Sequence, residues 1–387
     1  MTQPFVYSLI DYGAMIDCEP RMRVYAAALQ RAVTPGCTVI DLGAGFGVFS
    51  LLACKFGAGQ VIAIEPDPNV ELLRPLAEAN GCADRITIVR DISTRYTPPH
   101  KADVIVSDCR GTMPLFDHHI ATIKDARERL LAPGGTLLPL RDTIKVALAN
   151  SPHTYRQWRK PWRSNAYGLD LSAAHALVIN NEGKTRLGAG VLASVPQTLA
   201  VIDYRTATQP NLDATVELEA HKQGRVHGLL VWFDAEIAEG LGYSNAPGEP
   251  PLVYGQMFLP LADPPRLKAG DKVTARIRGN FVQNRYIWSW EGAVIDARTG
   301  TRSGHFRQSN FLGPVIAKDA LHARSNRQVP ERSVLMQIDR DCLAMVDGKQ
   351  DQDGIAKALL ARYPEHFASY HAALDHVVSL MLRYSRD

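Results

Sequence analysis

Short apolar runs alternate with helical stretches between residues 38 and 140. The apolar runs are rich in Val, Ile and Leu, and they read TVIDLGAG, VIAIEP, ITIVRD, ADVIVSD and GTLLPL. Residues 67–80 and 118–131, which lie between such runs, have the composition of helices. Strand–helix alternation at this spacing predicts an α/β domain, with a mostly parallel sheet and helices on both of its faces.

The helical pattern almost vanishes between about residues 143 and 315. Short strand-like runs replace it, separated by Gly, Pro and Asn. In KVTARIR, the apolar residues Val273, Ala275 and Ile277 alternate with polar ones, so one face of this strand should be buried. We therefore expect an all-β sandwich or barrel. The aromatic and basic segment at about 154–172, TYRQWRKPWRSNAYGLDLS, interrupts the strands and is expected to project as an arm.

The last sixty residues are helical again. Apolar positions recur there at spacings of three to four residues, including Ile355, Leu359, Phe367, Tyr370, Leu374, Val377 and Met381. We predict three parts: residues 1–141, 142–325 and 326–387. The third part faintly resembles small helical modules that recognise precursor peptides in natural-product pathways. The alternative, which we favour, is a cap that packs on the barrel or extends a dimer.

Composition narrows the function classes. The chain has 387 residues, 46% of them hydrophobic, and a net charge of only +3, which does not indicate a nucleic-acid partner. No run approaches the 18 apolar residues of a membrane span, and the N-terminus lacks the pattern of a signal peptide. Six scattered cysteines without a CxxC pair predict neither a disulfide framework nor a zinc site. We expect a soluble, cytoplasmic protein without a membrane partner.

A glycine-rich turn follows the first predicted strand. Asp41 precedes Gly43, Gly45 and Gly47, whereas the dinucleotide pattern GxGxxG would require glycine in place of Val48. The spacing resembles motif I of class I methyltransferases, and dinucleotide binding becomes a minor alternative. The turn alone would be weak support. The next strand ends in Glu65 and Pro66, 24 residues after Asp41, where an acidic side chain can accept both ribose hydroxyls.

Asp91 and Ile92 follow the third predicted strand, where such enzymes hold adenine. The alternative for Asp91 is an ordinary acidic residue at the end of a strand.

The order of segments from about residue 7 to 313 resembles a protein arginine methyltransferase. The segments MIDCEPRMRVYAAAL, LAPGGTLLPLRDT, YGLDLS and VHGLLVWFD carry the resemblance. It implies a seven-stranded, Rossmann-like class I domain followed by a β-barrel, S-adenosyl-L-methionine as cofactor, and a homodimer formed through the arm. It also implies that Arg21 holds the methionine carboxylate of the cofactor and that Tyr12 and Met15 pack near it. Without the resemblance, Arg21 would be predicted as a solvated surface residue.

The family's acceptor site is altered in this chain. Two glutamates nine residues apart grip a guanidinium in the family, and SDCRGTMPLFD keeps the spacing with Asp108 and Asp117. Shorter side chains withdraw both carboxylates by about a bond length, and methyl transfer tolerates little such slack. The family's Thr-His-Trp loop is replaced by Leu252, Val253 and Tyr254, which we consider substrate residues.

Arg110, inside the altered hairpin, would either neutralise Asp108 or bind a substrate carboxylate. His118 and His119 are expected to lie at a helix start or on the surface, without a metal. Cys109 has no histidine partner near it in sequence and is expected to be a small buried residue rather than a nucleophile.

These features predict a methyltransferase that acts on a nitrogen, or an NH-activated carbon, of a small molecule or peptide. Asp108 and Asp117 would orient the acceptor and receive its proton. The alternative within the class is N-methylation of arginine, free or in a protein. A non-catalytic scaffold is the alternative outside the class, and the intact cofactor motif argues against it.

Overall fold

The computed structural model describes residues 7–323 and 325–384, and it divides into two compact units between Pro314 and Val315. The first unit begins with a parallel sheet of five strands in the order β3-β2-β1-β4-β5. Its strands are β1 (Thr38–Leu42), β2 (Gln60–Ile64), β3 (Ile86–Val89), β4 (Ala102–Ser107) and β5 (Leu131–Leu138). The predicted α/β class is confirmed, although this sheet has five strands within the described residues instead of the seven implied by the resemblance.

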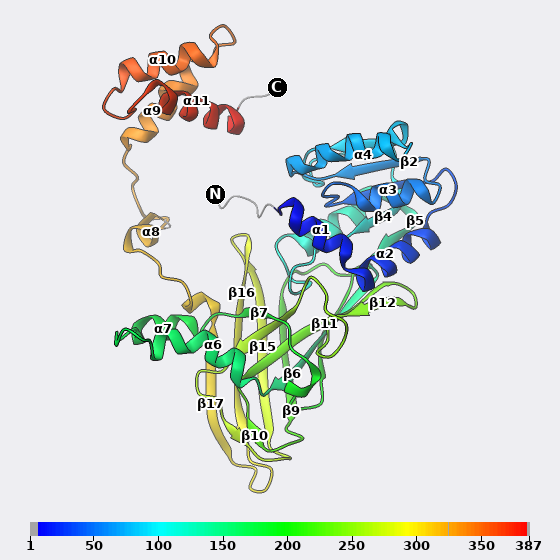
Figure 1. The fold of residues 1–387 in the computed structure, drawn as a ribbon, viewed down its shortest axis with the longest axis vertical. Helices are drawn as coiled ribbons and strands as arrows, with labels where there is room; N and C mark the ends of the chain where they lie inside the picture. The colour runs from blue at the N-terminus through cyan, green and yellow to red at the C-terminus, as the bar shows by residue number, and fades with distance from the viewer. Residues whose placement is uncertain (1–6, 324, 385–387) are drawn as a thin grey trace. The chain divides into compact units, whose positions relative to one another are not determined.

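Helices pack on both faces of this sheet because its strands are apolar on both sides. Val39 and Ile40 are neighbours in β1, yet their side chains belong to two different core clusters. Val39 packs in one cluster with residues of α2 (Glu19–Ala32) and α3 (Val48–Lys55). Ile40 packs in the other cluster with residues of α5 (His119–Asp125). The remaining helices of this region are α1 (Leu9–Asp17) and α4 (Leu73–Ala79) (Figure 1). Burial on both faces is the usual state of a parallel sheet.

The all-β region contains two larger antiparallel sheets. The first has the order β7-β13-β11-β6-β8, with β12 paired to β11, and the second has the order β17-β16-β15-β9. The strands are β6 (Arg141–Ala149), β7 (Gly183–Thr185), β8 (Gln197–Asp203), β9 (Leu212–Glu219), β11 (Gly228–Ala238), β12 (Leu241–Ser244), β13 (Gln256–Pro260), β15 (Lys272–Val282), β16 (Arg285–Ile295) and β17 (Arg302–Ser309), and the pair β10 (Gly224–Arg225) and β14 (Arg266–Leu267) forms a small third sheet.

The two regions of the first unit share their hydrophobic core. One cluster joins Ile40 and Ile105 of the parallel sheet to Val231 and Trp290 of the β region. This shared packing explains why no unit boundary falls near the predicted position at residue 141. The buried face predicted for β15 is confirmed, because Val273, Ala275 and Ile277 are all fully buried.

The predicted arm is helical and extends beyond residue 172. It consists of α6 (Pro152–Arg163) and α7 (Ser172–Val178), which lie beside the β region in Figure 1. Tyr155 anchors it by donating a hydrogen bond to the carbonyl of Leu261 at 2.7 Å. The loop between the two helices exposes Tyr167 and Leu169. This loop is the part of the arm that presents apolar side chains to solvent.

The second unit has a hydrophobic core of its own. It contains α8 (Lys318–Ala323), α9 (Val334–Ala344), α10 (Gln352–Arg362) and α11 (Tyr370–Tyr384). The predicted stripe residues Ile355, Leu359 and Val377 pack against Ile338 and Cys342 of α9. The stripe therefore finds its packing partner inside the unit. The unit begins eleven residues before the predicted boundary at 326, since β17 ends at Ser309 and only a short turn follows it. Both interpretations of this unit, a cap and a peptide-recognition module, stay predictions.

Candidate functional site

The turn between β1 and α3 requires its three glycines. Gly43, Gly45 and Gly47 have φ angles of +69°, +56° and +88°, a region that other residues rarely adopt. A Cβ atom on Gly43 would lie 2.5 Å from Sγ of Cys109, and one on Gly45 would lie 2.7 Å from the Tyr12 ring. The backbone of this turn is therefore closely approached from two sides and cannot carry side chains.

Asp41 supports this turn from the protein interior. Its Oδ2 accepts hydrogen bonds from the amide of Ser50 at 2.9 Å and from the Ser50 hydroxyl at 2.8 Å, which ties β1 to the first turn of α3. The carboxyl group is fully buried, and burial raises the pKa of Asp41 to about 7. The predicted cofactor residue Asp41 thus contributes by shaping the turn.

Glu65 lies at the end of β2 and faces the same turn. Its Oε2 accepts a hydrogen bond from the amide of Gly45, and its Oε1 accepts one from the amide of Asp67, both at 3.0 Å. Burial raises the pKa of Glu65, although both amide bonds act in the opposite direction. Each oxygen keeps a lone pair for a further donor, so the carboxylate can accept two hydroxyls. Pro66, next to it, is exposed.

Asp91 and Ile92 follow β3 and are both exposed or nearly so. The amide of Ile92 donates to Oδ1 of Asp91 at 2.7 Å, and Arg95 lies 3.8 Å from the same oxygen. Asp91, Glu65 and the glycine turn all follow the carboxyl ends of neighbouring parallel strands. Ligands of open α/β sheets bind at this edge.

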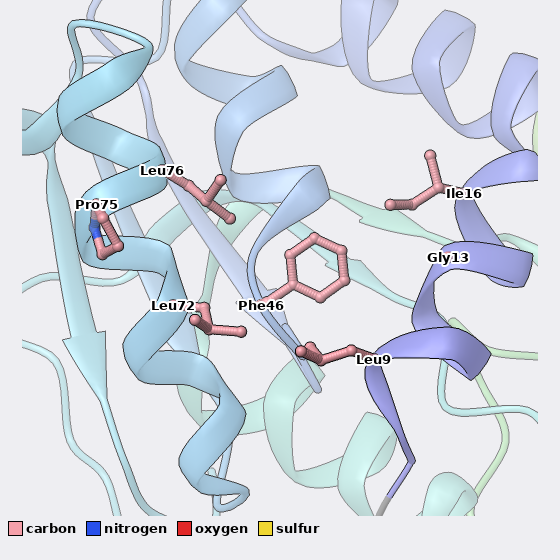
Figure 2. A pocket seen from close by; sticks show the side chains of 7 residues that line it. All are labelled: Leu9, Gly13, Ile16, Phe46, Leu72, Pro75 and Leu76. Atoms are coloured by element: carbon pink, nitrogen blue, oxygen red, sulfur yellow. The ribbon is translucent and has the colours of Figure 1, made fainter.

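Helix α1 covers the glycine turn. The ring of Tyr12 lies against Gly45 and contacts the edge of Phe46 at a centroid distance of 5.2 Å. Met15 is half-buried, and its carbonyl accepts a hydrogen bond from Nη1 of Arg21 at 3.1 Å. An apolar cleft of ≈ 280 Å³ opens beside this helix, and Figure 2 shows Leu9, Ile16, Phe46 and Leu72 on its walls.

Asp108 follows β4 and lies at the centre of a buried polar cluster. Its Oδ2 accepts hydrogen bonds from Nε of Arg21 and from the hydroxyl of Tyr254, both at 2.5 Å. Its Oδ1 accepts one from Nη1 of Arg110 at 3.0 Å. Burial would raise the pKa of Asp108, but the two guanidinium groups lower it below its usual value. Asp108 is therefore a stable carboxylate that is already neutralised by the chain's own arginines.

Arg110 is one of the most buried charged residues in the described chain. Its Nε and Nη2 bind Asp142 at 2.7 and 2.9 Å, and its Nη1 donates to the hydroxyl of Tyr25 at 2.7 Å. The hydroxyl of Tyr204 also donates to Asp142. The predicted substrate residue Arg110 is thus enclosed, and the geometry shows the other role weighed for it, which is to neutralise Asp108.

Asp117 differs from Asp108 in every respect that the structure shows. Its side chain is 61% exposed, its φ angle is +42°, and its Oδ1 lies 3.7 Å from Nε2 of His118. The two predicted catalytic carboxylates are therefore found in contrasting surroundings, one enclosed and one open to solvent.

The two histidines that follow Asp117 lie where α5 begins. His118 is exposed, as expected. His119 is the first residue of α5, which is the helix-start position that was one of the two predicted for it. Its side chain is buried against Tyr204, and burial lowers its pKa to about 3. Its Nε2 lies 3.1 Å from the Tyr204 hydroxyl, and its Nδ1 is buried without a hydrogen-bond partner among the described residues.

The loop before β13 brings the β region to this cluster. Tyr254 is buried and stacks on Tyr243, and their hydroxyls lie 3.0 Å apart. Leu252 is also buried, whereas Val253 is half-buried and its carbonyl accepts a hydrogen bond from Lys184 at 2.6 Å.

Sequence reasoning missed Asp142, Tyr204 and Tyr243, which lie far from the motifs along the chain. Asp142 and Tyr243 belong to β6 and β12, and Tyr204 directly follows β8. Within the described residues, no group of three or more His, Cys, Asp or Glu side chains is arranged to hold a metal ion, and no helix there is long and apolar enough to cross a membrane.

Two family models match the chain in succession. The model of ribosomal protein L11 methyltransferase matches residues 23–138, and the model of the arginine methyltransferase oligomerization subdomain matches residues 143–288. The boundary between the two matches lies where the parallel sheet gives way to the β region.

The curated relatives and solved structures that resemble this chain are arginine methyltransferases. The chain is 28% identical over 272 residues to an arginine N(omega)-methyltransferase of Streptomyces achromogenes subsp. streptozoticus, an alignment that covers 68% of this chain and 74% of that protein. It is 29% identical to the probable histone-arginine methyltransferase 1.4 of Arabidopsis thaliana, over 70% of this chain and 54% of that protein.

The fold matches that of a Trypanosoma brucei PRMT1 enzyme–prozyme complex with AdoHcy, with a TM-score of 0.70 at 23% identity over 77% of this chain and 97% of that chain. It also matches protein arginine methyltransferase 10 of Arabidopsis thaliana, with a TM-score of 0.69 at 19% identity over 79% of this chain and 98% of that chain. The sequence and fold place this protein among the arginine-methyltransferase-like enzymes of the class I S-adenosylmethionine-dependent methyltransferases.

Proposed function

We propose that this enzyme transfers a methyl group from S-adenosylmethionine to a guanidino nitrogen of arginine. The observation that carries the proposal is the pair of carboxylates, Asp108 and Asp117, nine residues apart on the segment that follows β4. Paired carboxylates suit the planar fork of a guanidinium. The sequence alone favoured a different acceptor because both side chains are shortened, but the named relatives are arginine methyltransferases and support arginine better.

The residues around the glycine turn fit the cofactor. The Glu65 carboxylate, fixed by two backbone amides, would accept the ribose hydroxyls. Tyr12 and Met15 of α1 would cover it. Arg21 makes no hydrogen bond through Nη2 within the described residues, so this nitrogen remains to bind the methionine carboxylate. The bound cofactor supplies a methyl group on a positively charged sulfur.

The two carboxylates would divide the work at the acceptor. Asp108 is held by Arg21, Arg110 and Tyr254, so its position is fixed and it is a poor proton acceptor. Asp117 is exposed and makes no ion pair with an arginine of the described residues, so it would bind the substrate guanidinium and receive the proton that methylation releases.

We propose that the enzyme is a homodimer formed through the arm. The family model that matches residues 143–288 describes an oligomerization subdomain and includes α6 and α7. Tyr167 and Leu169 on the arm, and Leu9 and Ile16 of α1, are exposed apolar groups that a second copy would cover. Sedimentation should show a dimer, and Tyr167→Ser with Leu169→Ser should shift it to monomer. A cytoplasmic location stays a prediction.

A second candidate is methylation of a nitrogen or NH-activated carbon in another small molecule. Two features favour it: Val253 stands where the family has histidine, and Asp108 is already occupied by arginines of the chain itself. Mass spectrometry of methyl transfer to free arginine, an arginine peptide and an indole separates the candidates. Methylated arginine is the expected product, and turnover of the indole without arginine turnover would refute the proposal.

A further inference from the structure

Arg110 and His119 hold corresponding positions on the segment that carries the two acceptor carboxylates. Arg110 lies two residues after Asp108, and His119 lies two residues after Asp117. Both side chains are almost fully buried, whereas Asp117 itself is mostly exposed. Each carboxylate is thus followed by a buried polar side chain, and both of these side chains contact Tyr204.

Tyr204 lies between the two buried side chains. Its hydroxyl is 3.1 Å from Nε2 of His119, and the centre of its ring is 5.8 Å from the guanidinium carbon of Arg110. The same hydroxyl donates a hydrogen bond to Asp142. Asp142 also accepts two hydrogen bonds from Arg110, at 2.7 and 2.9 Å. Tyr204 and Asp142 of the β region therefore bind both ends of the segment together.

The direction of the hydrogen bond between His119 and Tyr204 follows from these contacts. The single hydrogen of the Tyr204 hydroxyl goes to Asp142, because a carboxylate paired with an arginine only accepts. The hydroxyl oxygen therefore accepts from Nε2 of His119, which leaves Nδ1 as a buried acceptor without a partner among the described residues. Such an acceptor costs stability, so the bond to Tyr204, and not packing, accounts for a histidine at this position.

The backbone of Tyr204 is fixed on both sides. The residue is fully buried, and its amide donates to the carbonyl of Leu140 at 3.0 Å. Its carbonyl accepts a hydrogen bond from Nη1 of Arg127 at 2.6 Å. Leu140 lies between β5 and β6, and Arg127 lies in the helical turn that follows α5. Tyr204 is therefore a fixed point to which the segment is attached.

Asp117 depends on its neighbours for its position. Its carboxylate accepts no hydrogen bond from the described residues, and its backbone has a left-handed φ of +42°. On one side of it, Leu115 is buried in the core that the parallel sheet shares with the β region, and the Phe116 ring lies against Gly111. On the other side, His119 begins α5 and binds Tyr204. The exposed carboxylate is thus placed by the buried residues that flank it.

We propose that Tyr204 is a positioning residue for methyl transfer, which fixes Asp117 relative to Asp108 by binding His119 and Asp142 at the same time. This inference rests on the proposed role of Asp117 at the acceptor and adds how that carboxylate is placed. Both acceptor carboxylates are on short side chains, and reacting groups tolerate little displacement. The Tyr204 hydroxyl acts on the acceptor through the backbone of residues 117–119.

A double-mutant cycle between Tyr204→Phe and Asp117→Asn tests this role. Tyr204→Phe keeps the ring and removes the hydroxyl, and it should lower kcat/KM for arginine by roughly 10- to 100-fold, the effect of a displacement of up to about 1 Å. S-adenosylmethionine affinity by calorimetry should stay at the wild-type value. In the Asp117→Asn background, Tyr204→Phe should cause no further loss, because the carboxylate that it positions is absent.

The matched control is Tyr363→Phe, which removes a hydroxyl that donates to Asp341 at 2.6 Å in the second unit. It should keep the wild-type kcat/KM.

Two variants of His119 separate positioning from support of the fold. His119→Gln offers an amide donor in place of Nε2 and should keep most of kcat/KM, whereas His119→Leu should lose as much as Tyr204→Phe. His119→Leu also removes the unpartnered Nδ1, so its unfolding midpoint should not fall with its activity. Activity that follows the unfolding midpoint across these variants would show that Tyr204 only supports the fold.

Two results of the cycle would also overturn the positioning role and leave arginine methylation intact: additive losses, or wild-type kcat/KM in Tyr204→Phe. If the wild-type enzyme does not methylate arginine, the proposed function fails. Hydrogen exchange of the enzyme with S-adenosylhomocysteine then decides how Asp117 is placed. Faster exchange at the amides of residues 116–122 in Tyr204→Phe than in the wild type supports the inference, and unchanged exchange there refutes it.

Discussion

The cofactor half and the acceptor half of this site are built in different ways. At the cofactor half, the important groups are backbone atoms and one carboxylate, Glu65, that two amides fix locally. At the acceptor half, Asp108 depends on side chains from distant parts of the sequence, since Arg21 lies 87 residues before it and Tyr254 146 residues after it. The first half follows the family pattern, and the second half has been rearranged.

The buried charges at the acceptor half balance one another. Asp108 and Asp142 bring two negative charges into the interior, and Arg21 and Arg110 bring two positive ones. Burying a charge is costly unless it is paired and hydrogen-bonded, and each of these four groups is. The cluster can therefore be buried, but it leaves Asp117 as the carboxylate of the pair that is open to a substrate. The contrast predicts that the two aspartates respond differently to mutation.

The largest effect is expected at Asp117. Asp117→Asn should lower kcat by roughly 10²–10⁴-fold, because the group that orients the acceptor and receives its proton would be lost. Cofactor affinity by calorimetry and the unfolding midpoint should stay near those of the wild type, since this side chain is mostly exposed. Glu239→Gln, another exposed acid, is the control. If Asp117→Asn keeps the wild-type turnover, a group other than Asp117 orients the acceptor and receives its proton.

The buried cluster should respond through stability. Arg110→Met leaves Asp142 without its arginine and Asp108 with Arg21 as its remaining arginine, and it should lower the free energy of unfolding by about 3–5 kcal/mol, as measured by urea denaturation. Adding Asp142→Asn removes one orphaned charge, so the double variant should be less destabilised than the sum of the single ones. Additive losses would mean that the two side chains do not act as a pair.

The sequence predicted the geometry of the glycine turn better than that of the polar cluster around Asp108, for a physical reason. Glycines at a strand–helix turn and an acid at the end of the next strand report local backbone geometry, so Gly43, Gly45, Gly47 and Glu65 were recognised from their spacing. The partners of Asp108 are set by tertiary packing. Tyr243 and Asp142 lie on strands of the β region, and their local sequences contain no signal of a polar cluster.

Arg110 illustrates the same limit within a single residue. Its position beside Asp108 is compatible with two roles, which are to neutralise that carboxylate or to bind a substrate. The local sequence does not distinguish between them. The choice depends on Asp142 in β6, which binds the guanidinium through both of its oxygens. Likewise, the stripe along α10 and α11 was recognised as apolar, but its partner, α9, became evident only from the packing of the second unit.

The cofactor half can be tested at Glu65. Glu65→Ala should weaken S-adenosylmethionine binding by roughly 10- to 100-fold, since a hydrogen bond to a charged group contributes about 1.5–3 kcal/mol. Asp91→Asn should have a smaller effect, because Asp91 is exposed and already accepts from the Ile92 amide. Calorimetry of S-adenosylmethionine binding to the two folded variants measures this difference in affinity. Unchanged affinity in Glu65→Ala would remove this residue from the cofactor site.

The smallest effect tests how Asp108 is held. Tyr254→Phe removes the hydroxyl that donates to Asp108. Tyr243→Phe removes the hydroxyl of the tyrosine stacked on Tyr254, and among the described residues that hydroxyl contacts only the hydroxyl of Tyr254. The pKa of Asp108 is low in the folded enzyme, so its charge is present at neutral pH and is lost as the pH falls through that value. Arg21 and Arg110 account for most of this lowering, and Tyr7, Tyr25, Cys109 and His119 are the other titratable groups around it.

Removing the Tyr254 hydroxyl should raise the pKa of Asp108 toward its ordinary value. The acidic limb of kcat/KM should then begin at a higher pH in Tyr254→Phe than in the wild type, while Tyr243→Phe should keep the wild-type limb. A purely structural role for Tyr254 would lower the unfolding midpoint in both variants and leave the pH profile in place. Identical profiles for all three proteins would therefore show that Arg21 and Arg110 hold Asp108 without help from the β region.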